Sequence, residues 1–128
     1  MFTVWTNGCF DILHRGHIEL FKFASENLGG ELVVGLDSDE RVRELKGGDR
    51  PRNTLEDRLA VVSSIQYVSR VFTFNSNKEL EDLVRQVSPK YMVVGSDYKI
   101  EEVIGSQFCG EVLLFKKLEG YSSSNYLK

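Results

Sequence analysis

The chain has 128 residues, a formal net charge of −3, two cysteines and two histidines. This length fits one domain with a substantial core, and the composition, 41% hydrophobic and 27% charged, is ordinary for a globular protein. The acidic balance argues against nucleic acid as a partner, but it allows a small anionic substrate in a locally basic cleft. No apolar run reaches the ~20 residues needed to cross a bilayer, and the N-terminus lacks a secretory pattern. We therefore expect a single cytoplasmic domain over residues 1–128, without a membrane partner.

Short apolar runs alternate with helical patterns along the chain. Strands are expected at about residues 3–6, 31–36, 70–74, 91–95 and 111–115. Four helices are expected, at about residues 16–28, 38–45, 54–65 and 77–87, and a short helical turn is expected at 100–104. Asp37 or Ser38 is the expected cap of the second helix, and Thr54 is the expected cap of the third. The third of these has an apolar stripe of Leu55, Leu59, Val62 and Ile65. Strands separated by helices predict an α/β fold, a doubly wound five-stranded parallel sheet of Rossmann-like type.

The most informative stretch runs from Asn7 to His17, between the first strand and the first helix. In a parallel sheet this turn lies at the carboxyl end of the strand, where ligands bind. The helix start offers backbone N–H groups and a partial positive charge that suit a phosphate. His14 and His17 flank Gly16 at that position, and a protonated imidazole can donate from either ring nitrogen. The alternative is that one histidine caps the helix or packs in the core. Cys9 and Cys109 have no metal spacing and are expected to be reduced thiols.

Two further segments carry phosphate-binding chemistry. The glycine-rich loop that follows residue 45 places Lys46, Arg50, Arg52 and Arg58 near a helix start, which suits a phosphorylated ligand. The alternative is a solvated loop with local ion pairs, and for Arg52 this alternative is favoured. Near the C-terminus, the hydroxyls of residues 122–124 can cap a helix and bind phosphate. Every candidate segment follows a strand or begins a helix, so one edge of the sheet is expected to carry this chemistry.

His-x-Gly-His at residues 14–17, together with the other two segments, closely resembles the signatures of the cytidylyltransferase-like nucleotidyltransferases. The resemblance implies that His14 and His17 contact the triphosphate and stabilise charge, that Lys46 closes over it, and that Arg58, oriented by Glu56, contacts a substrate phosphate. Nucleotide contacts are implied for Gly8, Phe10, Gly16, Gly95, Asp97, Glu119, Ser122, Ser123 and Ser124. Acceptor-side contacts are implied for Asn7, Asp11, Asp37, Glu56 and Lys99, with Asp97 also on that side. Asp11 has three open roles: to orient a turn, to help place Mg²⁺, or to place the acceptor.

Within this family the motifs look most like the adenylyltransferase domain of the bifunctional ADP-heptose synthases. That resemblance implies a transfer from ATP to heptose 1-phosphate, with Mg²⁺ as cofactor and a homodimer as the assembly. Glycerol-3-phosphate cytidylyltransferase, which uses CTP, and an FAD synthetase, which uses ATP and FMN, share the size and the mechanism. A nucleotide-binding module without catalysis is the alternative from a different class of function. All three enzymes would transfer the nucleotidyl group by in-line attack on the α-phosphorus.

Overall fold

The computed structural model describes residues 1–95 and 103–115. Within these residues the strands are β1 (Thr3–Gly8), β2 (Glu31–Asp37), β3 (Val68–Phe74), β4 (Tyr91–Gly95) and β5 (Glu111–Phe115). They form one sheet in the order β3-β2-β1-β4-β5, and each neighbouring pair is parallel. The predicted five-stranded parallel α/β sheet is therefore confirmed, and all five carboxyl ends lie at the same edge.

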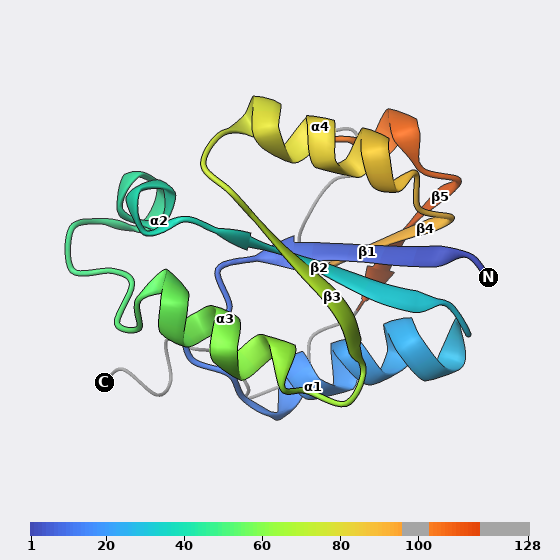
Figure 1. Cartoon of the computed structure of the whole chain (residues 1–128), viewed down its shortest axis with the longest axis horizontal. Helices are drawn as coiled ribbons and strands as arrows, with labels where there is room; N and C mark the ends of the chain where they lie inside the picture. The colour runs from blue at the N-terminus through green and yellow to red at the C-terminus, as the bar shows by residue number, and fades with distance from the viewer. Residues whose placement is uncertain (96–102, 116–128) are drawn as a thin grey trace.

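The helical elements in the described residues are α1 (Arg15–Lys22), the π-helical turn η1 (Phe23–Asn27), α2 (Asp39–Lys46), α3 (Leu55–Ser63), α4 (Asn77–Val87) and the 3-10 turn η3 (Ser106–Phe108). In Figure 1, α4 covers one face of the sheet, α1 and α3 cover the other, and α2 lies beyond the carboxyl end of β2. This two-faced covering is the doubly wound arrangement that the alternating pattern predicts. None of the described helices is long and apolar enough to cross a membrane.

The core has two layers because successive strand residues face opposite sides of the sheet. Val4, Leu32 and Val34 pack with α1 and α3 on one face, whereas Trp5 and Val33 pack with α4 on the other. The central strands β1, β2 and β4 are largely buried on both faces, as expected for a parallel sheet covered by helices, whereas the edge strands β3 and β5 are partly exposed. The rigid sheet thus fixes where each turn at its carboxyl edge begins.

The strand order reverses between β1 and β4, which are neighbours in the sheet although two strands separate them in the chain. The chain builds outward from β1 through β2 to β3, and then returns to the other side of β1. In an open parallel sheet, such a switch point opens a crevice at the carboxyl edge where ligands bind. The turn from Asn7 to His17 leaves β1 at this crevice.

The structure corrects several boundaries. The first helix is one α-helix followed by a π-helical turn, and not one continuous helix over 16–28. β3 begins at Val68 instead of Arg70, because exposed polar residues occupy its first half. The turn expected at 100–104 lies mostly outside the described residues, and a 3-10 turn at Ser106–Phe108 was not predicted.

Candidate active site

The two histidines form the beginning of helix α1. His14 is the N-cap, and its Nδ1 accepts the backbone N–H of Gly16 at 3.0 Å. His17 reaches back, and its Nδ1 accepts the backbone N–H of His14 at 3.1 Å. The two rings lie close, with centroids 4.0 Å apart. The histidine pair is thus a reciprocal capping box, in which side chains satisfy donors that a helix start otherwise leaves unpaired.

This capping fixes which ring nitrogen can donate. A backbone N–H can only donate, so the Nδ1 atom that accepts it carries no proton, and the neutral ring holds its proton on Nε2. While the caps are formed, Nδ1 of His14 and of His17 accepts a hydrogen bond and does not donate one. Helix capping and phosphate binding, which were alternatives in the sequence, are compatible here: Nδ1 caps and Nε2–H is the donor that a phosphate oxygen can use.

Phe10 packs against this pair. Its ring meets His17 edge to face, with centroids 5.5 Å apart at 83°, and meets Phe21 at 5.2 Å and 64°. Its backbone has a φ of 48°, which is unusual for a bulky residue. A Cβ on Gly8 would come within 3.2 Å of the same ring, so a side chain at the end of β1 would press against Phe10. Phe10 and Gly8, both predicted to contact nucleotide, thus take part in the packing behind His17.

The hydrogen bonds of Asp11 show one of the three roles that the sequence left open for it. Its buried carboxylate accepts the backbone N–H groups of Arg52 and Asn53, both at 2.7 Å. The side chain of Asn53 in turn donates to the Asp11 carbonyl at 2.7 Å. Of the three roles considered for Asp11, the structure shows the orientation of a turn: it joins the histidine turn to the loop that carries Arg52.

Arg58 departs most from expectation. Its side chain is 0% exposed, and its N–H groups donate to the carbonyls of Cys9, Asp37 and Asn53 and to the carboxylate of Asp39. The Asp39 contact is 2.7 Å. In this conformation the guanidinium holds the ends of β1 and β2 together. The orienting carboxylate is that of Asp39 and not that of Glu56, which lies exposed in the first turn of α3.

Burial and ion pairing shift the pKa values of Asp37 and Asp39 in opposite directions. Burial raises the pKa of Asp37 above its ordinary value, although its ion pair with Arg41 at 2.7 Å opposes this. Burial also acts on Asp39, but the bonds from Arg58 and from the backbone of Leu55 outweigh it, and the pKa of Asp39 is lowered. The family resemblance implied an acceptor-side contact for Asp37. In the structure its carboxylate is bound by Arg41.

Arg41 extends the polar contacts to the next strand end. It donates to Asn77 at 2.6 Å and lies over the ring of Phe74. Beside it, Ser38 caps α2 and bonds to Asn75. The turns after β2 and β3 are therefore tied to each other by contacts within the protein.

Asn7, Lys46 and Gly95 lie at the same edge of the sheet. Asn7 belongs to β1, and its Oδ1 accepts the indole N–H of Trp5 at 2.9 Å. Lys46 ends α2 and is exposed, and the next residue, Gly47, has a φ of 109° that favours glycine. Gly95 is the last residue of β4. The predicted candidates Asp97, Lys99, Glu119, Ser122, Ser123 and Ser124 lie outside the described residues.

Cys9 does not have the surroundings of a nucleophile. It is buried, and burial raises the pKa of its thiol even though Lys46 and Arg58 act in the opposite direction. A protonated thiol is a poor nucleophile. The part of Cys9 that the site uses is its carbonyl, which accepts Arg58 at 3.0 Å.

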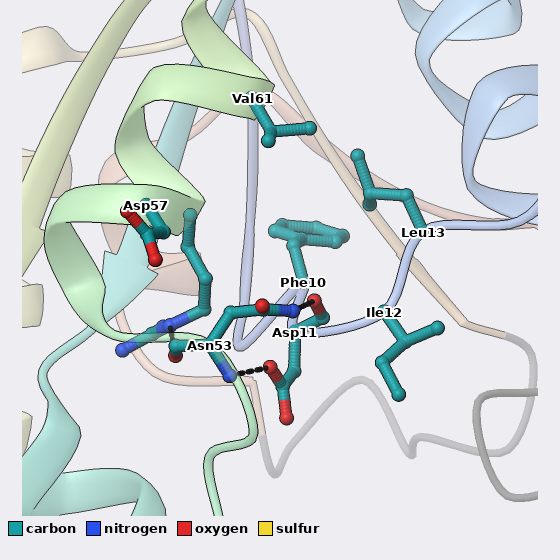
Figure 2. A pocket seen from close by; sticks show the side chains of 8 residues that line it. Phe10, Asp11, Ile12, Leu13, Asn53, Asp57 and Val61 are labelled. Atoms are coloured by element: carbon teal, nitrogen blue, oxygen red, sulfur yellow. Dashed lines mark hydrogen bonds between the residues drawn. The ribbon is translucent and has the colours of Figure 1, made fainter. Parts of the chain in front are cut away.

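A pocket of about 310 Å³ lies between the histidine turn and the start of α3. Figure 2 shows Phe10, Leu13 and Val61 on its apolar side, and Asp11 and Asn53 on its polar side. Asn53 and Asp39 are two site residues that the sequence did not predict. The signal for Asn53 was its position just before a helix cap, and the signal for Asp39 was its place in the first turn after β2.

The chain is a Rossmann-like domain in which a helix capped by two histidines begins at the switch point of the sheet. A family model described as cytidylyltransferase-like matches residues 5–128. The chain belongs to the cytidylyltransferase-like family. The resemblance drawn from the motifs is thereby confirmed, as is the assignment to the nucleotidyltransferases.

Relatives and solved structures agree with this placement. The chain is 41% identical to bifunctional protein HldE of Helicobacter hepaticus and 46% identical to that of Wolinella succinogenes, in each case over 98% of this chain and 26% of the relative. It thus spans about a quarter of the length of these relatives. A lipopolysaccharide core biosynthesis protein from Thermoplasma volcanium is 28% identical, with a TM-score of 0.72 over 95% of this chain and 99% of that one. Pantothenate synthetase from Thermus thermophilus, at 15% identity and a TM-score of 0.67, covers 98% of this chain and 61% of its own, and shares the fold alone.

Proposed function

We propose that the chain transfers the adenylyl group of ATP to a sugar 1-phosphate, heptose 1-phosphate in the first instance, and releases pyrophosphate. The observation that carries the proposal is the histidine pair at the start of α1, where Nδ1 of each ring is occupied by a cap and Nε2–H is the donor. Donors held in place before the reaction stabilise charge that develops on phosphate oxygens without reorganising. The start of α1 adds the favourable end of a helix dipole.

No covalent bond to the protein forms or breaks in this reaction. An oxygen of the acceptor phosphate forms a bond to the α-phosphorus of ATP, and the bond from that phosphorus to the β-phosphate oxygen breaks. Pyrophosphate takes the electron pair. Such a transfer depends on positioning and charge stabilisation, which is the chemistry that His14, His17 and Lys46 offer at this edge of the sheet.

The described residues do not fit a Mg²⁺ site built by the protein alone. They contain no cluster of three or more histidine, cysteine, aspartate or glutamate side chains placed to hold a metal ion. The carboxylates of Asp11, Asp37 and Asp39 are each bound by donors of the protein. Mg²⁺ commonly binds through substrate phosphates, so we expect it to arrive as the metal complex of the triphosphate.

The acceptor is inferred from similarity. The relatives carry the name bifunctional protein HldE, and the motifs resemble the adenylyltransferase part of a bifunctional ADP-heptose synthase. The similar protein of Thermoplasma volcanium is described as one of lipopolysaccharide core biosynthesis. A sugar phosphate therefore has more support than glycerol 3-phosphate or FMN. A homodimer and a cytoplasmic location stay predictions.

The test is pyrophosphate release with Mg²⁺, in which ATP and CTP are each combined with heptose 1-phosphate, glycerol 3-phosphate and FMN. We expect release with ATP and heptose 1-phosphate only. Release with CTP and glycerol 3-phosphate would contradict the substrates and keep the mechanism. Nucleotide binding without release in any combination would favour a module without catalysis. His17→Asn is the control for the role of the Nε2 donor. Its side-chain oxygen can accept the hydrogen bond that Nδ1 accepts in the wild type, but it has no donor in place of Nε2–H.

A further inference from the structure

Arg58 is buried where three chain segments meet: the residue after β1, the end of β2 with the start of α2, and the loop before α3. Four hydrogen bonds leave its guanidinium, to the carbonyls of Cys9, Asp37 and Asn53 and to the carboxylate of Asp39, at distances between 2.7 and 3.1 Å. A charged side chain is almost never fully buried unless it is paired, and here Asp39 supplies the pair. The residue is thus specialised for holding the backbone, because most of its donors are used on carbonyls.

One of these bonds reaches the histidines through a short chain of contacts. The carbonyl of Cys9 that accepts Arg58 belongs to the peptide group that leads into Phe10, whose φ of 48° is costly for a bulky residue. Such a conformation persists only when its surroundings hold it. Arg58 holds it on the N-terminal side, and the bonds of Asp11 to the 52–53 backbone hold it on the other.

The conformation of Phe10 decides where its ring lies. The ring stands edge to face against His17 and against Phe21, and the absence of a side chain at Gly8 leaves room for it. His17 is therefore held from two directions: its Nδ1 is fixed by the cap on His14, and its ring plane is limited by Phe10. Rotation of the peptide before Phe10 would remove the second constraint.

We propose that Arg58 and Asp39 are positioning residues for His17, acting through the Cys9 carbonyl and the ring of Phe10. The proposal rests on the proposed function, because it assigns the catalytic contact to His17. It differs from the role implied by resemblance, in which Arg58 contacts a substrate phosphate directly. Experiments can separate the two roles. If Arg58 contacts the phosphate directly, substitution of Asp39 should have a much smaller effect than if Arg58 and Asp39 act together on His17.

The first test reads the histidines without substrate. The chain has only two histidines, so the ring signals of His14 and His17 can be assigned by nuclear magnetic resonance. We expect Arg58→Lys and Asp39→Asn to shift the His17 ring signals in the same direction. Arg85→Lys and Asp82→Asn are matched controls, since they alter an exposed ion pair on α4, and should leave both rings unchanged. Unchanged His17 signals in folded Arg58→Lys and Asp39→Asn would overturn the proposal.

The second test reads the reaction. A misplaced catalytic group costs up to about 10²-fold in rate, so both site variants should lower kcat by about 10- to 100-fold with little change in KM for the acceptor. Phe10→Leu leaves the buried ion pair of Arg58 and Asp39 in place. It should also lower kcat with little change in KM for the acceptor. Full kcat in a folded Phe10→Leu, or a raised acceptor KM in Arg58→Lys with normal kcat in Asp39→Asn, would overturn the proposal. A shift of the His17 ring with no reaction on any acceptor would support the positioning and contradict the proposed function.

Discussion

At the scale of single residues, each histidine caps helix α1 through Nδ1 and, under the proposed function, donates to phosphate through Nε2. Nδ1 of His14 accepts the N–H of Gly16, and Nδ1 of His17 accepts the N–H of His14. Protonation of Nδ1 would set two donors against each other, so each cap requires an Nδ1 that carries no proton. If the proposed function holds, a substitution of either ring changes both the stability of the helix start and the reaction.

Substitutions at His14 separate the two tasks. Asparagine is a good N-cap and keeps an acceptor near the Nδ1 position, whereas alanine removes it at a cost of about 0.5–2 kcal/mol. We expect His14→Asn to unfold in urea near the wild-type midpoint and His14→Ala to unfold earlier. Both lack the Nε2 donor, and loss of one such donor lowers turnover by about 10²–10³-fold. Near-normal turnover of folded His14→Asn would show that the His14 ring does not stabilise the reacting phosphates.

The opposite pKa shifts of Asp39 and Asp37 predict opposite effects of pH on stability. The pKa of Asp39 is lowered in the folded state, so its contribution is present above the ordinary value of 3.8 and is lost as pH falls through the folded pKa. The pKa of Asp37 is raised, so its contribution is lost as pH rises through the folded value. As pH rises toward 3.8, Asp39→Asn should flatten the rise of urea stability with pH, and as pH rises above 3.8, Asp37→Asn should steepen it. Identical slopes in the two variants would contradict these assignments.

At the scale of elements, α3 shows where a periodic pattern misleads. The apolar stripe predicted Leu59 inside, yet Leu59 is 37% exposed and Arg58 is buried with Val62. Carbonyls at the carboxyl ends of β1 and β2 extend beyond the sheet ladder and need donors, and Arg58 supplies them. No hydrophobicity pattern carries that requirement, because it depends on which strand ends lie beside the helix.

The loop between α2 and α3 is fastened to the histidine turn by the side chain of Asp11. Asp11→Asn replaces one accepting oxygen by a donor, which leaves a backbone N–H of Arg52 or Asn53 unmatched at a cost of about 1–3 kcal/mol. We expect trypsin to cleave after Lys46 and Arg52 faster in this variant than in the wild type. Asp49→Asn, which alters an exposed carboxylate in the same loop, is the control. Equal cleavage rates in Asp11→Asn and wild type would contradict the fastening role.

At the scale of the whole molecule, the fold could be predicted because its signals are local. Short apolar runs, glycine punctuation and helix caps such as Thr54 predict alternating strands and helices, and the alternation leads to a parallel sheet. The order β3-β2-β1-β4-β5 was not predictable in this way, since it depends on which crossovers pack on which face. The π-helical turn at Phe23–Asn27 also has no sequence signal that distinguishes it from an α-helix.

The site could be predicted in part for a topological reason. His14 and Asp37 lie at turns that follow parallel strands, and Gly95 ends another parallel strand, so these three residues had to lie at one edge of the sheet. What the sequence left open is which polar groups serve ligands and which serve the backbone. Asp11 and Arg58 have the residue types of ligand-binding groups, but in the structure their hydrogen bonds hold neighbouring turns. Only the path of the backbone around them reveals this.

The central claim is a direct attack of the acceptor phosphate on the α-phosphorus, with the protein providing position and charge stabilisation but no nucleophile. The stereochemistry at that phosphorus tests it most directly. ATP made chiral at the α-phosphorus by sulfur substitution is converted with the accepted sugar phosphate, and the configuration of the nucleotide sugar is determined. A single in-line displacement predicts inversion. Retention would contradict the claim, because it requires two displacements and therefore a covalent intermediate on the protein.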